Sequence, residues 1–268
     1  MSNPLRDLAK ATVYGGYARL LRPLPRAALA RMGAQRLVIL LYHRVSDEFR
    51  DSVTIGCDHF EAQMAHIARH YPLLSLDNLI AGDFDRHARR PLIAVTFDDG
   101  YLDNYANAVP ILRRHKVPAG FFVSTGIVGT NRGFAHDLKK LGRALPNMSW
   151  EQIGEMKEMG FFIGAHTVNH ANLAKVDDKT ARYELTESMR TLRERLGLQD
   201  VAIAYPFGKR SDITEERRQM IRELGYTACF SAYGGRNSFP LDLFDIRRSG
   251  VNFAYTRTAF EALLEGWV

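Results

Sequence analysis

Short apolar runs alternate with longer stretches of helical periodicity along most of this sequence, and this alternation restricts the possible folds most strongly. The apolar runs lie at residues 37–42, 92–97, 118–123, 161–164, 201–204, 226–230 and 244–246. The helical stretches lie at residues 58–70, 102–115, 149–160, 177–196, 214–224 and from about 258 onwards. Because strands that alternate with helices form parallel β/α units, we predict an α/β fold with one sheet or barrel.

Two of the predicted helices begin with a pair of polar residues in capping-box spacing. Asp58 with Glu61 precedes the first helix, and Ser149 with Gln152 precedes the third. Such pairs satisfy the free backbone N–H groups of a first helical turn. The longest stretch is followed by Gly197, which predicts its end there.

The chain is long enough for one large domain. It has 268 residues, of which 46% are hydrophobic and 25% charged, as in soluble globular proteins. Residues 37–268 are expected to form that domain, because no linker, repeat or low-complexity tract divides them. Cys57 and Cys229 are far apart and lack metal-ligand spacing, so they fit a reducing compartment and neither demand nor exclude a disulfide.

The first 36 residues form a separate basic segment. They contain seven Lys and Arg residues and a single acidic residue, Asp7, and so account for the whole net charge of +6. The rest of the chain is neutral overall, which argues against nucleic acid as a partner. Apolar residues recur in residues 1–36 at roughly helical spacing, so we expect a helical N-terminal extension. It either packs on the domain or lies as an amphipathic helix on an anionic membrane surface.

We expect a cytoplasmic protein, held by this extension at the inner face of the membrane. No uninterrupted apolar run reaches the roughly 7–15 residues of a secretory h-region. None approaches the roughly 18 residues that a membrane span requires.

Ionisable side chains follow three of the predicted strands. His43 comes directly after residues 37–42, and Asp98 and Asp99 follow residues 92–97. His166 and His170 follow the short strand at residues 161–164. Functional groups of parallel α/β folds gather where the strands end at their carboxyl side. An Asp-Gly turn alone would explain Asp99 followed by Gly100, but the three strand ends together indicate one site.

The spacing of His166 and His170 suits a metal ion. If the segment is helical, two imidazoles four residues apart point the same way, and a strand-end carboxylate completes a set of two histidines and one carboxylate. The zinc-protease pattern is excluded because Thr167 occupies its glutamate position. One aspartate could bind the ion while its neighbour, for which Asp98 is the candidate, activates water. A cation would offset the repulsion between the carboxylates and lower the pKa of bound water to about 7.

Three segments resemble the polysaccharide deacetylases of carbohydrate esterase family 4, the NodB-homology family. They are Thr96-Phe97-Asp98-Asp99-Gly100, His166-Thr167-Val168-Asn169-His170 and, more weakly, Ala204-Tyr205-Pro206-Phe207-Gly208. The resemblance covers about residues 37–255. It implies a distorted (β/α)7 barrel that removes N-acetyl groups from sugars with a divalent metal, zinc before cobalt or nickel. It also implies that Asp98 is the base and that Asp99, His166 and His170 bind the metal.

The sequence departs from the family pattern in two places. The third segment has Ala204 and Phe207 where the family usually has arginine and tyrosine, so we expect Arg247 or Arg248 to tune Asp98. The backbone N–H of Phe207 can still stabilise the oxyanion, since that role needs no side chain. Tyr205 and Pro206 are expected to contact the substrate.

The family's C-terminal histidine, its usual general acid, is also missing, because no histidine follows His170. His43, in Tyr42-His43, is the expected replacement. This arrangement resembles the subgroup that deacetylates poly-β-1,6-N-acetylglucosamine and similar exopolysaccharides.

The expected function is therefore metal-dependent de-N-acetylation of N-acetylglucosamine residues in an exopolysaccharide or its lipid-linked precursor. Three alternatives stay open at this stage: an amidohydrolase for small amides, an inactive sugar-binding homologue and a two-histidine iron oxygenase. An intact base beside the metal ligands argues against the second. The absence of the oxygenase's usual His-x-Asp pair argues against the third.

Overall fold

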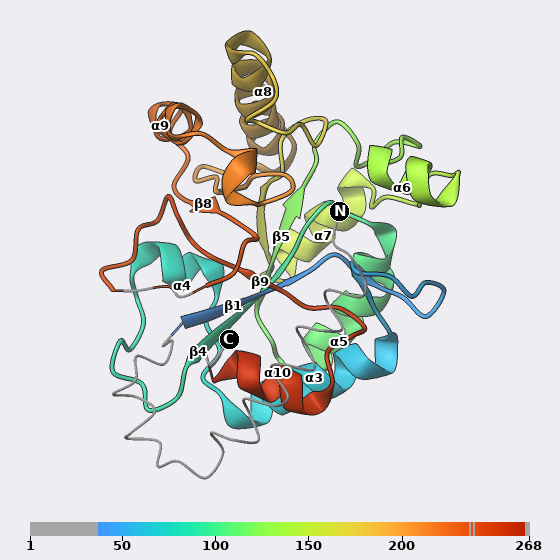
Figure 1. Cartoon of the computed structure of the whole chain (residues 1–268), viewed down its shortest axis with the longest axis vertical. Coiled ribbons are helices and arrows are strands. Elements are labelled where there is room, and N and C mark those ends of the chain that lie inside the picture. Colours follow the sequence, from blue (N-terminus) through green and yellow to red (C-terminus); the bar gives the residue numbers. More distant parts are fainter. Residues whose placement is uncertain (1–36, 236, 238, 266–268) are drawn as a thin grey trace.

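A curled sheet of seven parallel strands forms the centre of the protein (Figure 1). The computed structural model describes residues 37–235, 237 and 239–265. The strand order is β8-β7-β6-β5-β4-β1-β9. The strands are β1 (Leu37–Tyr42), β4 (Leu92–Phe97), β5 (Ala119–Val123), β6 (Phe162–Ala165), β7 (Ile203–Ala204), β8 (Cys229–Phe230) and β9 (Ser249–Gly250). A separate parallel pair consists of β2 (Arg44–Val45) and β3 (Thr54–Ile55).

Helices connect the strands and cover the outside of the sheet (Figure 1). The α-helices are α3 (Cys57–His70), α4 (Leu76–Ala81), α5 (Val109–Arg114), α6 (Ala135–Leu141), α7 (Trp150–Glu158), α8 (Asp178–Leu196), α9 (Glu215–Glu223) and α10 (Arg257–Leu264). A π-helix, η1 (Asn104–Ala108), leads into α5, and a 3-10 turn, η2 (Arg210–Asp212), leads towards α9.

Alternate side chains of each strand enter two different cores. In β1, Val38 and Leu40 pack outwards with side chains of α3, α5, α7 and α8, whereas Leu37 and Ile39 pack on the inner face. The inner cluster also contains Ala94 of β4 and side chains of α4. Successive side chains of a strand point to opposite faces, so both faces of this buried sheet are apolar. Every second residue of each strand therefore faces the inside of the sheet. The inward-facing residues just after the carboxyl ends of the strands can be polar.

The segment after β8 brings the two edges of the sheet towards each other. Ile246 forms an isolated bridge with Phe230 at the end of β8, and Ser249 then pairs with Leu40 of β1. This segment links the first and last strands of the order, as a strongly curled sheet requires. The sheet is a half-barrel, and the predicted distorted (β/α) barrel is confirmed.

Most predicted elements are present, with some corrections. The capping box at Ser149 and Gln152 is confirmed, and Gly197 ends α8 in a left-handed conformation. The box at Asp58 is wrong, because the N-cap of α3 is Gly56, which offers no side-chain cap, and Asp58 lies in the first turn of the helix. The last strand is β9, whereas the expected strand at residues 244–246 supplies only the Ile246 bridge.

Several short elements were not predicted from the sequence: the strands β2, β3 and β9, the helices α4 and α6, the π-helical turn η1 and the 3-10 turn η2. The N-terminal extension, residues 1–36, lies outside the described residues, so the expected helix there stays a prediction. Among the described residues, no helix has the length and apolarity needed to cross a membrane.

Candidate active site

Three strands deliver their last inner-face side chains to one place. His43 follows Leu37, Ile39 and Leu41 in the two-residue period of β1. Asp98 follows Ala94 and Thr96 of β4 in the same way, and His166 follows Phe162 and Gly164 of β6. Because β1, β4 and β6 are parallel members of one sheet, these side chains lie at its carboxyl edge.

The backbone leaves the strands in left-handed turns, a conformation that is uncommon for residues other than glycine. Asp99, Thr167, His170 and Phe207 have φ angles of 76°, 60°, 57° and 65°. Only one other described non-glycine residue, Lys116, has a positive φ. Such conformations cost on the order of 1–3 kcal/mol each and persist where the surrounding structure enforces them. Left-handed residues of this kind gather at active sites, so their concentration here supports the expectation of a functional site.

The segment from His166 to His170 is a turn, so the expectation of a helical arrangement is wrong. The buried carboxylate of Glu184, on α8, holds this turn. It accepts hydrogen bonds from the backbone N–H groups of Val168 (2.9 Å) and Asn169 (2.8 Å) and from the Asn169 side chain (2.7 Å). Left-handed residues at both Thr167 and His170 then bring the two imidazoles together.

Asp99, His166 and His170 form a cluster that fits a metal ion. Their potential ligand atoms all lie within 4.8 Å of one another. Asp99 Oδ1 lies 3.3 Å from Nε2 of His170 and 3.5 Å from Nε2 of His166, and neither contact is a well-directed hydrogen bond. Oδ1 is buried without a hydrogen-bond partner among the described residues. Since buried carboxylate oxygens are almost always paired, this oxygen is available to a cation.

A backbone carbonyl fixes the orientation and the tautomer of His166. Nδ1 of His166 lies 2.6 Å from the Ala204 carbonyl oxygen. A carbonyl only accepts hydrogen bonds, so Nδ1 carries the proton. In the neutral imidazole, Nε2 then has a free lone pair that faces Asp99. Contacts of this kind fix the ring orientation and tautomer of metal-binding histidines.

Burial and the neighbouring charges shift the pKa values of the cluster in opposite directions. Burial raises the pKa of Asp99, but His166 and His170 outweigh it and lower this pKa well below its usual value. Burial lowers the pKa of His166, but Asp98 and Asp99 outweigh it and raise the value. For His170 burial dominates and the pKa is lowered, although Asp99 opposes the shift.

Asp98 is paired with Arg248 and not with Arg247. Two parallel hydrogen bonds of 2.7 Å join the Arg248 guanidinium to both carboxylate oxygens of Asp98. Both side chains are buried, and Arg248 also donates to the Ser231 carbonyl at 2.7 Å. Burial raises the pKa of Asp98, but Arg248 and His166 outweigh it and lower the value. Arg247 instead pairs with Asp245 at 3.5 Å.

His43 lies between β1 and β2, close to both carboxylates. Burial lowers the pKa of His43, while the charges of Asp99 and Asp98 oppose this shift. Its ring makes no hydrogen bond with any described residue, so both nitrogens are free. The backbone is held from the start of the π-helix η1. Asn104 of η1 donates from Nδ2 to the His43 carbonyl at 2.7 Å, and Asp103, the residue before η1, accepts from the Val45 N–H at 3.3 Å.

A buried arginine supports the same segment. Arg44 pairs with Asp51 and, at 3.3 Å, with Asp137 of α6. Asp137 also accepts a 2.6 Å hydrogen bond from the Tyr101 hydroxyl. These contacts tie the residue after His43 to the loop after β4 and to α6.

The third motif forms a turn whose exposed residue is Phe207. Phe207 is 51% exposed as a residue, and its ring lies edge-on to His170, with 4.8 Å between the ring centroids. Its backbone N–H donates to no described residue. Tyr205 has no exposed surface and donates from its hydroxyl to the carbonyls of Gly208 and Lys209, at 3.1 and 3.2 Å. Pro206 is buried as well. Tyr205 therefore supports the turn, and the expected substrate contacts of Tyr205 and Pro206 stay predictions.

A comparison with protein families decides the classification. Residues 85–229, more than half of the chain, match the family described as polysaccharide deacetylase.

The chain belongs to the polysaccharide deacetylase family.

Two relatives and one solved structure illustrate the similarity. YxkH of Bacillus subtilis (strain 168), whose name describes it as a polysaccharide deacetylase, is 26% identical to this chain. The match covers 86% of this chain and 76% of YxkH. The poly-beta-1,6-N-acetyl-D-glucosamine N-deacetylase of Staphylococcus aureus (strain MSSA476) is 25% identical over 71% of this chain, which spans 65% of that protein. The structure of Streptococcus pyogenes deacetylase PplD in complex with acetate is 25% identical, with a TM-score of 0.70, and covers 86% of this chain and 97% of its own.

The family match includes the aspartate pair, both site histidines and Phe207. His43 and Arg248 lie outside the matched residues. The sequence analysis had named both as candidates, and the structure brings them to the site. Sequence reasoning missed Glu184, Asn104, Asp137 and Tyr101. No local pattern identifies them, because each acts on a residue that is distant in the sequence.

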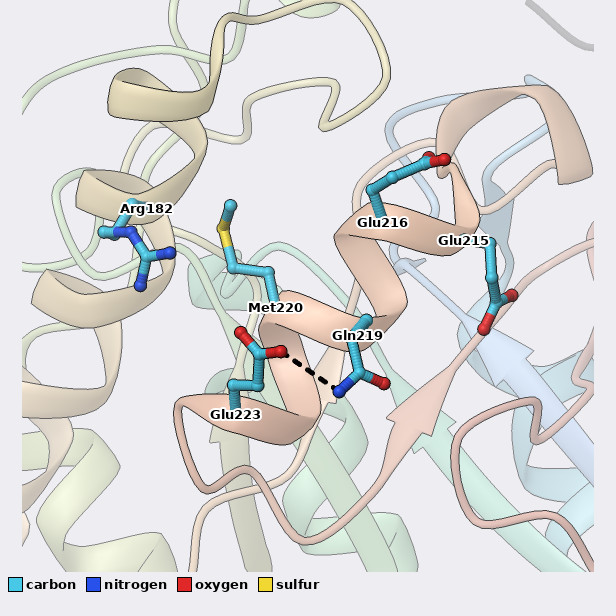
Figure 2. Close-up of a pocket in the computed structure, with 6 residues that line it drawn as sticks. All are labelled: Arg182, Glu215, Glu216, Gln219, Met220 and Glu223. Atoms are coloured by element: carbon cyan, nitrogen blue, oxygen red, sulfur yellow. Dashed lines mark hydrogen bonds between the residues drawn. The ribbon is translucent and has the colours of Figure 1, made fainter.

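A shallow acidic hollow lies between α8 and α9 and is separate from the candidate active site. Figure 2 shows its lining, in which Gln219 donates to Glu223 at 3.1 Å. None of the lining residues belongs to the site; they are Arg182, Glu215, Glu216, Gln219, Met220 and Glu223.

Proposed function

We propose that this deacetylase removes acetyl groups, with the help of a divalent metal ion, from N-acetylglucosamine residues of an exopolysaccharide or its lipid-linked precursor. The observation that carries the proposal is the buried Oδ1 of Asp99, which lies between two imidazoles with no hydrogen-bond partner in the described part of the chain, next to the ion-paired Asp98. The S. aureus relative, whose name gives poly-beta-1,6-N-acetyl-D-glucosamine as its substrate, supports the choice of sugar.

Asp99, His166 and His170 would hold the metal. Two imidazole nitrogens and one carboxylate oxygen match catalytic zinc sites, which keep further positions open, so zinc is the proposed ion before cobalt or nickel. When bound, the ion acts as a Lewis acid towards the acetyl oxygen and lowers the pKa of water.

Asp98 is proposed as the general base. Arg248 and His166 hold its pKa low, so the carboxylate is ionised and can accept the proton of the attacking water. The fixed bidentate pair also limits where the carboxylate can move. The free N–H of Phe207 is proposed to donate to the oxygen of the acetyl group as negative charge develops there.

His43 is proposed as the general acid. As the carbon–nitrogen bond breaks, a proton from His43 goes to the departing sugar nitrogen, and the products are acetate and a free amine. This role requires a protonated ring, which Asp99 and Asp98 favour and burial disfavours. Because its nitrogens have no hydrogen-bond partner among the described residues, the ring is available to the substrate.

Acetate release from a defined β-1,6-linked N-acetylglucosamine oligomer tests the proposal. We expect release that stops after treatment with a chelator and returns when zinc is added. Simple N-acetylated amines without a sugar ring should release much less acetate. If small amides are cleaved and the oligomer is not, the protein is an amidohydrolase for small amides. If the metal binds and nothing is cleaved, it is a sugar-binding homologue.

The lipid-linked precursor and a cytoplasmic location are the finer part of the proposal. They are supported only by the basic, amphipathic sequence of residues 1–36, which lies outside the described residues. An amphipathic basic segment near an anionic leaflet would hold the enzyme where lipid-linked sugars are assembled.

A further inference from the structure

Besides His43, one further histidine lies beside the proposed metal ligands, and it has no part in the reaction described above. His136 lies in the first turn of α6, and its ring centroid is 5.7 Å from that of His170. The ring stacks on buried Phe134 at 5.5 Å with an angle of 27° between the planes. The side chain is 34% exposed, so a molecule bound at the site can reach it.

The hydrogen bonds around His136 determine which ring nitrogen carries the proton. Tyr101 donates its single hydroxyl proton to Asp137 at 2.6 Å, and Asp137 also faces Arg44 at 3.3 Å. The Tyr101 oxygen must therefore accept from Nε2 of His136, which lies 2.9 Å away. In the neutral ring, Nδ1 is then an acceptor. Among the described residues, Nδ1 has no hydrogen-bond partner.

The surroundings of this free acceptor suit a sugar. His136 and the half-exposed ring of Phe207 both pack against His170, at 5.7 and 4.8 Å. One offers a hydrogen-bond acceptor and the other an apolar face. A pyranose ring has hydroxyl donors along its edge and C–H groups on its faces, so it can use both.

We propose that Nδ1 of His136 accepts a hydrogen bond from a hydroxyl group of the saccharide and so contributes to substrate specificity. The proposal rests on the function proposed above and extends it to a residue that selects the sugar. Asp137 anchors His136 in this role, because its contacts with Arg44 and Tyr101 fix the first turn of α6.

Two substitutions separate this role from a structural one. His136→Gln places an amide near the position of Nε2 and removes the acceptor at Nδ1. His136→Asn places its amide oxygen or nitrogen near Nδ1 and removes the contact with Tyr101. His87→Gln, in the exposed loop before β4, is the matched control.

We expect His136→Gln to raise KM for the N-acetylglucosamine oligomer about three- to tenfold, the size expected for one neutral hydrogen bond. The kcat value and the metal content should not change. His136→Asn should stay close to the wild type, and neither variant should differ from it on a small acetyl ester without a sugar.

Equal losses in both variants, a loss of metal or an equal loss on the ester would overturn the proposal, because His136 would then only support Tyr101 or His170. If the wild type is active on the oligomer and His136→Gln has an unchanged KM, only this inference fails. If the wild type releases no acetate from any N-acetylglucosamine oligomer, the proposed function fails and the inference fails with it.

Discussion

Arg248 binds Asp98 through two parallel hydrogen bonds of 2.7 Å, although 150 positions separate them in the sequence. The pair is buried, and its partners include the Ser231 carbonyl and the ring of Phe122, 5.2 Å from the guanidinium. The carboxylate proposed as the base is therefore charged because of a side chain from the end of the barrel.

Replacing Arg248 should damage both stability and activity. Arg248→Met leaves the buried Asp98 charge unpaired, which costs about 3–5 kcal/mol of unfolding free energy. We expect acetate release to fall at least about 100-fold, because Asp98 loses the partner that keeps it ionised and fixed. Urea unfolding and acetate assays measure the two effects. Arg247→Met is the matched control, and its activity should stay within about twofold of the wild type. A larger loss would mean that Arg247 also contributes to the reaction and that the effect is not specific to Arg248.

Metal content and turnover should separate in the aspartate and histidine variants. His166→Ala removes one of three proposed ligands, so the purified protein should contain little zinc and release no acetate. Asp98→Asn should keep its zinc and lose about 100- to 10,000-fold in turnover. Elemental analysis and acetate assays on the same samples test this. Full zinc occupancy in His166→Ala would disprove the ligand assignment.

The loss of turnover in His43→Ala should depend on the leaving group of the substrate. An amine must be protonated as it departs, so we expect a loss of about 100-fold or more on the sugar amide. A phenyl acetate has a leaving group that needs no proton, so the loss there should be small. Asp98→Asn should be slow on both. If His43→Ala keeps wild-type kcat on the amide, the general acid is another group.

Asp103 should make the protein less stable as the pH rises. Burial raises the pKa of Asp103 from 3.8 to about 7. Between these values the folded protein holds a proton that the unfolded chain has released. Stability therefore falls as the pH increases from about 4 to about 7. Asp103→Asn keeps an acceptor for the Val45 N–H and should remove this part of the slope. Urea titrations at pH 4.5 and 7.5 compare the variants; an unchanged slope would contradict the prediction.

Residues 1–36 should bind anionic membranes. Each basic residue near an anionic leaflet contributes about 1 kcal/mol, so several together can hold the protein there. The full chain should sediment with anionic vesicles at low salt and less at high salt, while a variant without residues 1–34 should not sediment. If the full chain ignores such vesicles at low salt, the extension packs on the domain or contacts another copy.

The strand-end chemistry was predictable because it follows local rules. Apolar runs identified β1, β4 and β6, and His43, Asp98 and His166 follow these runs closely at the carboxyl ends, where functional groups of parallel α/β folds gather. Choosing between Arg247 and Arg248 was not possible from sequence alone. Neighbouring residues of an extended segment face opposite ways, and the start of β9 was not visible in the sequence.

The turn at His166–His170 shows why the remaining geometry was missed. Four-residue spacing suggested a helix, but the left-handed backbone of Thr167 and His170 depends on Glu184, which belongs to α8. The same holds for His43, whose carbonyl is held by Asn104 from the π-helix η1. Such long-range contacts override local preference, and no single segment contains the information.

The long separation of Asp98 and Arg248 also sets when a new polypeptide can become active. A chain emerging from the ribosome exposes the aspartate pair and both site histidines well before Arg248 has been synthesised. Until then the Asp98 carboxylate lacks the guanidinium that pairs with both of its oxygens, and burying it without this partner is costly. A chain that does not yet contain Arg248 would therefore lack a working base, and catalysis would begin only after this arginine had been added and had reached Asp98.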